Sequence, residues 1–225
     1  MAGVLYGVSV GPGDPELITV KAVRILEKCG TIAVPRTMGE NTLALSIAEQ
    51  AADLSGKRIV YLDFPMSSDK ELVCANYDRI AAFLCDELER GDTALINLGD
   101  TGVYSTFSYI AERVAAVGYA AEYVPGVTSF CAASALCGAP LVSGDEVLTV
   151  IPYSSPDLSE LLERRGTKVV MKSGRHSGEL LQLLRSKGLA ERTYIAENCG
   201  LPTERLLSGA QVDGDTGYFT VFIVK

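Results

Sequence analysis

Short apolar segments that end in turn-forming residues alternate with helical segments through the first half of this chain. The segment Val4–Val10 leads directly into the turn Gly11–Asp14, and a helical pattern follows over Leu17–Cys29 with its apolar residues on one face. Strands that alternate with helices over short connections predict a mostly parallel sheet covered by helices on both faces. The chain is therefore expected to belong to the α/β class.

The alternation continues as far as Val117. Further strands are expected at Thr31–Pro35, Arg58–Leu62 and Thr93–Leu98, and helices at Thr42–Ala52, Lys70–Arg90 and Tyr104–Val117. A proline and a glycine interrupt the pattern near Ala120–Pro125. We therefore predict an N-terminal α/β domain over residues 1–120.

Residues 121–225 are expected to form a second α/β domain. Its predicted helices are Thr128–Cys137, Asp157–Arg164 and Gly178–Lys187, and its predicted strands are Val147–Ile151, Thr167–Met171, Thr193–Glu197, Arg205–Ser208 and Tyr218–Val224. The last strands follow one another without a helix, which favours antiparallel pairing and hence a mixed sheet. Two lobes of this kind place the natural ligand site in the cleft between them.

Composition narrows the functional classes. Apolar residues make up 48% of the 225 residues, enough for a real core, and the net charge of −8 argues against nucleic acid as a partner. No apolar run is long enough to span a bilayer, and the start lacks a signal-type pattern, so we expect a soluble, cytoplasmic protein.

The six cysteines are scattered and there is one histidine, so neither a metal site nor a disulfide framework is expected. Most of the cysteines fall in apolar or helical stretches, where a small buried thiol is the common interpretation.

Glycine-bearing loops occur in three places: Gly11–Asp14, Leu98–Thr106 and Pro125–Ser129. Glycine lets a ligand approach the main chain, and ligands of open α/β sheets bind outside the carboxyl ends of the strands. The first loop fails the dinucleotide pattern G-x-G-x-x-G, which makes a nicotinamide oxidoreductase an unfavoured alternative. The structural alternative for each loop is an ordinary turn with a helix cap from Asp14, Thr19 or Thr128.

Asp100 is the polar residue of these loops that most favours a role in ligand binding. A carboxylate at a strand tip can accept from ligand hydroxyl or amino groups, and it also attracts a sulfonium cation. Its structural alternative is an N-cap of the helix that follows. We favour the functional interpretation, because capping does not need Thr101, Ser105 and Thr106 as well.

Basic residues after two strands are candidate anion contacts. They are Arg36, which follows the second strand, and Lys172 and Arg175, which lie in the second half beside the only histidine, His176. A lone histidine in a loop is more often solvated or hydrogen-bonded than catalytic. The chain has no Cys/His pair that would support a hydrolase.

Taken together and in this order, the loops resemble the tetrapyrrole methylase family over essentially the whole chain, Val4–Lys225. Within that family the chain is most similar to the precorrin-2 C20-methyltransferase group, which includes its cobalt-factor II counterpart. The residues that carry this closer likeness are Gly7–Glu16, the Phe64–Met66 turn, Tyr104–Phe107, Val124–Phe130 and Gly144–Glu146. One departure is Thr101, where the family usually carries proline after Gly-Asp.

The resemblance implies a fold of two α/β lobes, commonly a homodimer, with S-adenosylmethionine held between the lobes. Residues 1–120 would then carry the substrate side and the first cofactor loops, and residues 121–225 the remaining cofactor contacts. It implies cofactor contacts at Pro12, Leu98, Gly99, Asp100, Val103, Thr128, Ser129, Met171 and Gly200. It implies a tetrapyrrole substrate, whose carboxylates Arg36, Lys172 and Arg175 would bind, and no protein-bound metal. Asp100 or a water molecule would accept the proton that leaves C20.

The resemblance leaves alternatives open. The chain would be an S-adenosylmethionine-dependent methyltransferase of vitamin B12 biosynthesis acting at C20 of precorrin-2 or cobalt-factor II. One alternative is a methylase for a different ring position, for example of uroporphyrinogen III. The other is a tetrapyrrole-binding protein without catalytic activity.

Overall fold

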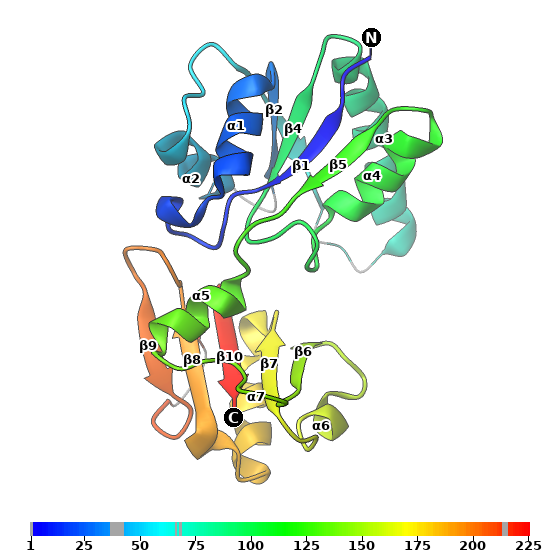
Figure 1. The fold of residues 1–225 in the computed structure, drawn as a ribbon. Coiled ribbons are helices and arrows are strands. Elements are labelled where there is room, and N and C mark those ends of the chain that lie inside the picture. Colours follow the sequence, from blue (N-terminus) through cyan, green and yellow to red (C-terminus); the bar gives the residue numbers. More distant parts are fainter. Residues whose placement is uncertain (1, 37–42, 66, 68, 213–215) are drawn as a thin grey trace. The chain divides into compact units, whose positions relative to one another are not determined.

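The computed structural model describes residues 2–36, 43–65, 67, 69–212 and 216–225. Within it the chain divides into two compact units, Met1–Thr128 and Ser129–Lys225, and each contains one five-stranded sheet (Figure 1).

The sheet of the N-terminal unit is entirely parallel. Its strands are β1 (Leu5–Ser9), β2 (Thr31–Arg36), β3 (Arg58–Asp63), β4 (Thr93–Asn97) and β5 (Ala121–Val124). They are arranged in the order β3-β2-β4-β1-β5. The carboxyl ends of all these strands therefore lie at one edge of the sheet, and β1 lies between β4 and β5.

Helices cover both faces of this sheet, as expected. Helices α1 (Val20–Lys28) and α2 (Leu43–Ala51) lie on one face, and α3 (Lys70–Leu88) and α4 (Phe107–Ala116) lie on the other (Figure 1). Successive residues of β1 point to opposite faces. Leu5 packs in the core beneath α3 and α4, whereas Tyr6 and Val8 pack in the core beneath α1 and α2.

The sequence analysis missed strand β5. It is an edge strand of four residues, and Glu122 and Tyr123 in its middle are exposed. A segment this short carries little hydrophobic periodicity, and pairing with β1 holds it in the sheet. The break at Pro125 and Gly126 thus follows the last strand of the first sheet, and the first unit ends shortly after it, at Thr128.

Two helices begin later than their patterns predict. Asp14 caps a 3₁₀ turn over Pro15–Leu17, and α1 starts only after Thr19, whose hydroxyl accepts a hydrogen bond from the backbone N–H of Ala22 at 3.1 Å. Helix α4 starts at Phe107 because Tyr104 has a φ of 52°, which interrupts helical geometry.

The sheet of the C-terminal unit is mixed, which confirms the prediction. Its strands are β6 (Leu148–Pro152), β7 (Thr167–Met171), β8 (Thr193–Glu197), β9 (Arg205–Ser208) and β10 (Thr220–Val224), in the order β6-β7-β10-β8-β9. Strands β6 and β7 are parallel, and β10 is antiparallel to both β7 and β8. Loops that follow β7 and β8 therefore share one edge with the start of β10.

One face of this second sheet carries α5 (Ser129–Leu136), and the other carries α6 (Leu158–Leu161) and α7 (Ser177–Ser186). Short 3₁₀ turns precede α7 at Gly174–His176 and β8 at Ala190–Arg192. The predicted helix Asp157–Arg164 is wrong in length, because hydrogen bonds between residues three apart tighten its end beyond Leu161.

All six cysteines are free thiols, and only Cys29 is buried. Burial raises its pKa to about 12. The interpretation of most cysteines as buried core residues was wrong, since Cys74 and Cys131 are exposed.

Among the described residues, none of the helices combines the length and the hydropathy that crossing a membrane requires.

Candidate functional site

The loops that follow β1 and β4 are joined through their backbones. Gly11 donates to the carbonyl of Gly99 at 3.2 Å, and Gly99 donates to the carbonyl of Gly11 at 2.7 Å. This pair extends the contact between two neighbouring strands beyond the sheet edge. The first two predicted loops therefore form one continuous surface.

Asp100 joins the second loop to the third. Its Oδ1 accepts from the N–H of Gly102 at 2.7 Å, and its Oδ2 accepts from the N–H of Gly126 at 2.7 Å. Asp100 is therefore not an N-cap of α4, which begins at Phe107. Hydrogen bonds from N–H groups to a carboxylate are the stronger kind, so this residue fixes the relative position of the two loops.

Gly126 lies where no side chain fits. A Cβ at this position would lie 2.4 Å from the Cβ of Ser9 and 2.8 Å from the carbonyl oxygen of Gly99. Real Cβ atoms do not approach other atoms so closely; Ser9 ends β1, and Gly99 belongs to the second loop. The third loop can approach the other two only because residue 126 is glycine.

Two buried hydroxyl groups lie beneath the three loops. Ser9 Oγ donates to the carbonyl of Val124 at 2.7 Å and accepts from the backbone N–H of Thr101 at 2.9 Å. The hydroxyls of Ser9 and Thr101 are 3.2 Å apart, and these residues are 0% and 2% exposed. This cluster ties β1, the second loop and β5 together from below.

The hydroxyl cluster was not identified from the sequence as part of the site. A signal was present, because Ser9 is a polar residue inside the otherwise apolar strand Val4–Val10. Thr101 was noted as a polar residue beside Asp100 and as a departure from the usual proline, but not as a partner of Ser9. Its backbone N–H, which a proline lacks, is the group that donates to Ser9.

The main chain at Gly99 is accessible to a ligand. Gly99 has a φ of 73°, and no atom lies within 4 Å of the position that a Cβ would occupy. Leu98 packs its side chain against the core under α1 and α2, and the N–H of Val103 donates to the carbonyl of Asp100 at 3.2 Å. The segment therefore presents backbone rather than bulky side chains, as close approach of an adenosyl group requires.

The first loop also contains the structural caps that the alternative interpretation proposed. Asp14 Oδ1 accepts from the N–H of Glu16 at 2.8 Å, so its carboxylate stabilises the turn that follows Pro12. Thr19 both caps α1 and donates to the carbonyl of Pro125 at 3.3 Å. Thr19 thus combines helix capping with a contact to the third loop.

In the C-terminal unit the candidate residues Met171 and Gly200 follow strands at one edge of the second sheet. Met171 ends β7, packs against the core beneath α5 and accepts from the N–H of Tyr153 at 2.8 Å. Gly200 has a φ of 80°, and its N–H donates to Glu204 Oε2 at 2.6 Å. The third loop of the N-terminal unit ends at Thr128, and Ser129 begins α5.

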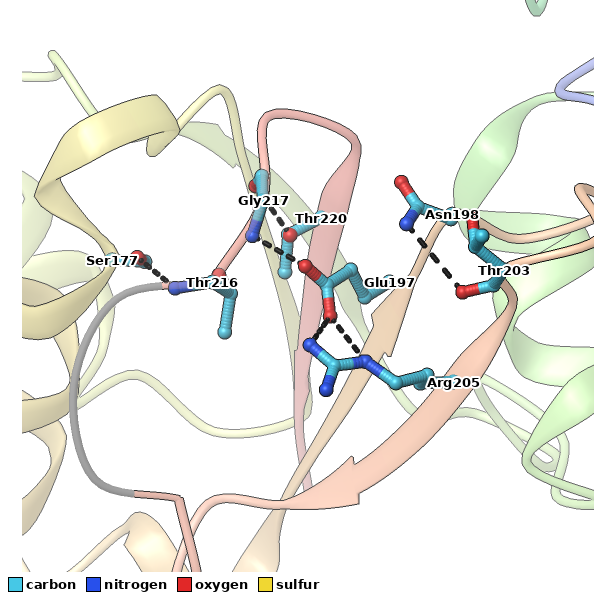
Figure 2. A network of polar contacts seen from close by, with 8 residues as sticks. All are labelled: Ser177, Glu197, Asn198, Thr203, Arg205, Thr216, Gly217 and Thr220. Carbon is cyan, nitrogen blue, oxygen red and sulfur yellow. Dashed lines mark hydrogen bonds and ion pairs between the residues drawn. The ribbon is translucent and has the colours of Figure 1, made fainter.

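A buried acid holds the segment before Gly200. Figure 2 shows Glu197, at the end of β8, between the N–H of Gly217 on one oxygen and the guanidinium of Arg205 on the other. Asn198, which follows it, has a φ of 53° and donates to the carbonyl of Thr203 at 3.5 Å. Glu197 is 4% exposed, whereas the side chain of Arg205 is 59% exposed, so a buried carboxylate pairs with an arginine at the surface of the unit.

The predicted anion contacts are spread over both units. Arg36 ends β2 and is already paired with Asp63, at 2.9 Å from Nε to Oδ1. Lys172 has a φ of 59° directly after β7, and Arg175 is an exposed residue of the 3₁₀ turn before α7. Met66, in the turn after β3, lies outside the described residues.

The ring of His176 contacts two neighbouring side chains, those of Tyr153 and Glu179. Its ring stacks on Tyr153 with centroids 5.3 Å apart, and its Nδ1 lies 3.2 Å from Glu179 Oε1. Hydrogen bonds from Tyr153 and then His176 lower the pKa of Glu179. These contacts agree with the interpretation of a hydrogen-bonded rather than a catalytic histidine.

Comparison with known proteins places these loops in context. The profile of the Tetrapyrrole (Corrin/Porphyrin) Methylases matches residues 4–210. A relative from Methanocaldococcus jannaschii, named as a probable cobalt-precorrin-2 C(20)-methyltransferase, is 35% identical over 199 residues, covering 86% of this chain and 84% of its own. The cobalt-precorrin-2 C(20)-methyltransferase of Salmonella typhimurium is 34% identical over 234 residues, covering 100% of this chain and 97% of its own.

The fold also matches a solved structure. The uroporphyrin-III C-methyltransferase of Thermus thermophilus, crystallised with S-adenosyl homocysteine, has a TM-score of 0.70 and 23% identity, covering 99% of this chain and 97% of that one. The match shows the same arrangement of sheets and helices. With the family profile and the two relatives over most of its length, this chain belongs to the tetrapyrrole methylase family.

Proposed function

We propose that this protein transfers a methyl group from S-adenosylmethionine to C20 of precorrin-2 or cobalt-factor II in vitamin B12 biosynthesis. The observation that carries the proposal is the union of three glycine-bearing loops at the carboxyl edge of β4, β1 and β5. The names of the two relatives support C20 as the position of methylation.

The residues of the N-terminal unit fit the cofactor. Gly99 leaves the main chain open, and Asp100 brings a negative charge to the loops, which favours a ligand with a positive sulfonium. We propose contacts from Pro12, Leu98, Gly99, Asp100 and Val103 in this unit. We also propose cofactor contacts from Thr128, Ser129, Met171 and Gly200.

The chemistry that S-adenosylmethionine supplies when bound is a methyl group on a positively charged sulfur. The reduced macrocycle is electron-rich at C20, so the protein does not need to create a nucleophile. Its loops would set the direction and distance of the reacting atoms, which is the main contribution that positioning makes to such a reaction. The hydrogen bonds that join the loops supply the required rigidity.

Asp100 is best suited to positioning. Both of its oxygens already accept from backbone N–H groups, so its carboxylate shapes the loops whether or not substrate is present. We propose that its main role is to hold the second and third loops and to attract the cofactor. Asp100 or a bound water would also accept the proton that leaves C20.

The substrate carries several carboxylates, and we propose that Arg36, Lys172 and Arg175 bind them. Asp63 uses Nε and Nη2 of Arg36, which leaves Nη1 for a ligand. The pairing with Asp63 also orients the guanidinium at the end of β2. Arg36 would thus bind a substrate carboxylate without first losing its partner.

The direct test is an assay with methyl-labelled S-adenosylmethionine and precorrin-2, with and without inserted cobalt. The proposal predicts one labelled methyl at C20 with one or both substrates. Label at another ring position would favour a different tetrapyrrole methylase. Bound macrocycle without any transfer would favour a tetrapyrrole-binding protein that lacks catalytic activity.

We also propose that the protein is a cytoplasmic homodimer without nucleic-acid or membrane partners. Six free thiols suit a reducing compartment, and the acidic net charge of −8 suits a small-molecule enzyme rather than a nucleic-acid-binding protein. Light scattering on the purified chain tests the dimer. A mass near 23.9 kDa in solution would contradict it.

A further inference from the structure

The C-terminal unit contains an open cavity of about 870 Å³ that no part of the proposed function uses. Six basic side chains line it, against two acidic ones: Arg164, Arg165, Lys168, Lys187, Arg192 and Lys225 against Glu146 and Glu163. This concentration of positive charge stands out in a chain whose net charge is −8. A local basic site of this kind selects anions despite an acidic overall surface.

The sheet register explains why these residues meet. Strand β10 is antiparallel to β7 and β8, and Val224 pairs with Lys168 on one side and with Thr193 on the other. The end of β10 therefore lies beside the beginnings of β7 and β8. Met171 and Glu197 end those two strands at the opposite edge, so the cavity is separate from the loops that carry the candidate cofactor contacts.

Some of the basic side chains are already neutralised. Lys187 pairs with Glu163, and Arg164 pairs with Glu160 at 3.1 Å. Glu146 is occupied by its own turn, where Oε2 accepts from the N–H of Ser143 at 2.8 Å. The side-chain carboxylates of Glu146 and Glu163, the two acidic residues that line the cavity, therefore already have partners.

The remaining cations have no carboxylate partner in the part of the chain that is described: Arg165, Lys168, Arg192 and Lys225. Lys225 donates through Nζ to the backbone carbonyls of Pro140 and Leu141. Arg165 and Arg192 are exposed, with their guanidinium groups available to solvent. The cavity thus carries an excess of positive charge.

Lys168 is the most unusual of them because it is 4% exposed. Its Nζ donates to the carbonyls of Gly166 at 2.8 Å and Arg164 at 3.2 Å, and to no carboxylate in the described structure. Burial and then the nearby Arg192 lower its pKa. A buried ammonium group normally has an anionic partner, which these surroundings lack.

We propose that this cavity, named here the basic cavity, binds a small, multiply charged oxyanion such as a phosphate or a polycarboxylate. Arg165 and Arg192 present the planar donor pairs that such groups accept, and Lys168 supplies a fixed charge at the wall. The cavity volume lies within the usual range for small-ligand sites. This binding is independent of methyl transfer.

The test is isothermal titration calorimetry of the full chain with two probes, pyrophosphate and citrate, at low ionic strength. We expect saturable binding of one probe molecule per chain. In the double variant R165A/R192A the affinity falls by about tenfold or more, as loss of two charge-assisted contacts requires. Arg79→Ala, which removes the charge of an exposed arginine on α3, is the matched control and leaves the affinity unchanged.

Lys168→Met adds a second, independent variant that retains the length of the buried chain. We expect this variant to bind the probe more weakly than the wild type. Far-ultraviolet circular dichroism shows whether the variant folds. If it does not fold, the comparison of wild type with R165A/R192A decides the test. Binding of pyrophosphate alone or citrate alone identifies the source of the oxyanion within the proposed class. Absence of saturable binding, or equal affinity in wild type and R165A/R192A, overturns the proposal.

Discussion

In the N-terminal unit, backbone amides, two buried hydroxyls and one carboxylate join the loops at the carboxyl edge of the sheet. In the C-terminal unit, the loop after β8 is held instead by the buried Glu197 between an arginine and a backbone amide. The first arrangement depends on close approach of main chains. The second depends on a buried charge and its partner.

The difference has a physical consequence. Short contacts between backbones tolerate almost no added volume, so substitutions that add atoms should damage the N-terminal loops most. A buried carboxylate such as Glu197 is instead most sensitive to loss of its charge or of the groups that donate to it. The two units should therefore respond differently to steric and to electrostatic substitutions.

The largest effect is expected for Gly126→Ala. Because the added Cβ would lie 2.4 Å from the Cβ of Ser9, the third loop must move away from the other two. We expect the free energy of unfolding to fall by about 3 kcal/mol, measured by urea denaturation, together with loss of cofactor affinity. Gly30→Ala is the control, since nothing lies within 4 Å of its Cβ position, and an equal loss there would contradict the steric explanation.

A smaller loss is expected for Glu197→Gln. The amide keeps the size of the side chain but places an N–H donor against Arg205 or Gly217, both of which donate to this residue. Chemical denaturation should show a loss of about 2 kcal/mol. Glu160→Gln removes an exposed partner of Arg164 and should change stability by less than about 0.5 kcal/mol. Similar values for both variants would show that the buried network carries no special weight.

Thr101→Pro tests the hydroxyl cluster. Proline removes the N–H that donates to Ser9 and also the threonine hydroxyl, so stability should fall by about 1 kcal/mol. Thr101→Val retains the N–H and removes only the hydroxyl, and it should cost less. If proline proves neutral, the departure from the usual family residue has no structural consequence.

The smallest effect concerns pH at the amino edge of the first sheet. The hydrogen bond from Lys28, and then that from the N–H of Val4, hold the pKa of Asp92 below its ordinary value. The native state therefore binds this proton less readily than the unfolded state, whose aspartate titrates near about 3.9. The stabilisation is fully present above that pH and is lost as pH falls through the lower native pKa.

Comparison of the wild type with Asp92→Asn measures this contribution. The difference in unfolding free energy between them should be largest near neutral pH and should shrink below about pH 4. The exposed Lys28 keeps the effect below about 1 kcal/mol. A difference that grows as pH falls would contradict this sign.

The parallel sheet of the first unit and the mixed sheet of the second were predicted because hydrophobic periodicity locates the strands and helices. The order of these elements along the chain then indicates parallel or antiparallel pairing. Eight of the predicted strand and helix cores in the second unit coincide with elements between Ser129 and Val224, whereas β5 was missed because four residues of an edge strand carry no clear period. The three loops were found from glycine and proline, which mark turns regardless of distant contacts.

What the sequence could not provide were the contacts between loops. That Asp100 accepts from Gly126 and that Ser9 meets Thr101 depends on β1 lying between β4 and β5, a strand order that no local pattern encodes. The same reason explains the basic cavity. Lys168, Arg192 and Lys225 come together only through the register of β10 with its neighbours.

The account depends most on the three joined loops as the cofactor site, and one titration tests it directly. Calorimetry with S-adenosylhomocysteine compares the wild type with Asp100→Ala and with Asp63→Ala, which removes the same charge at the end of β3. We predict that Asp100→Ala weakens binding by about tenfold or more while its circular dichroism remains native, and that Asp63→Ala binds as the wild type does. Unchanged affinity in a folded Asp100→Ala variant would contradict the assignment of these loops.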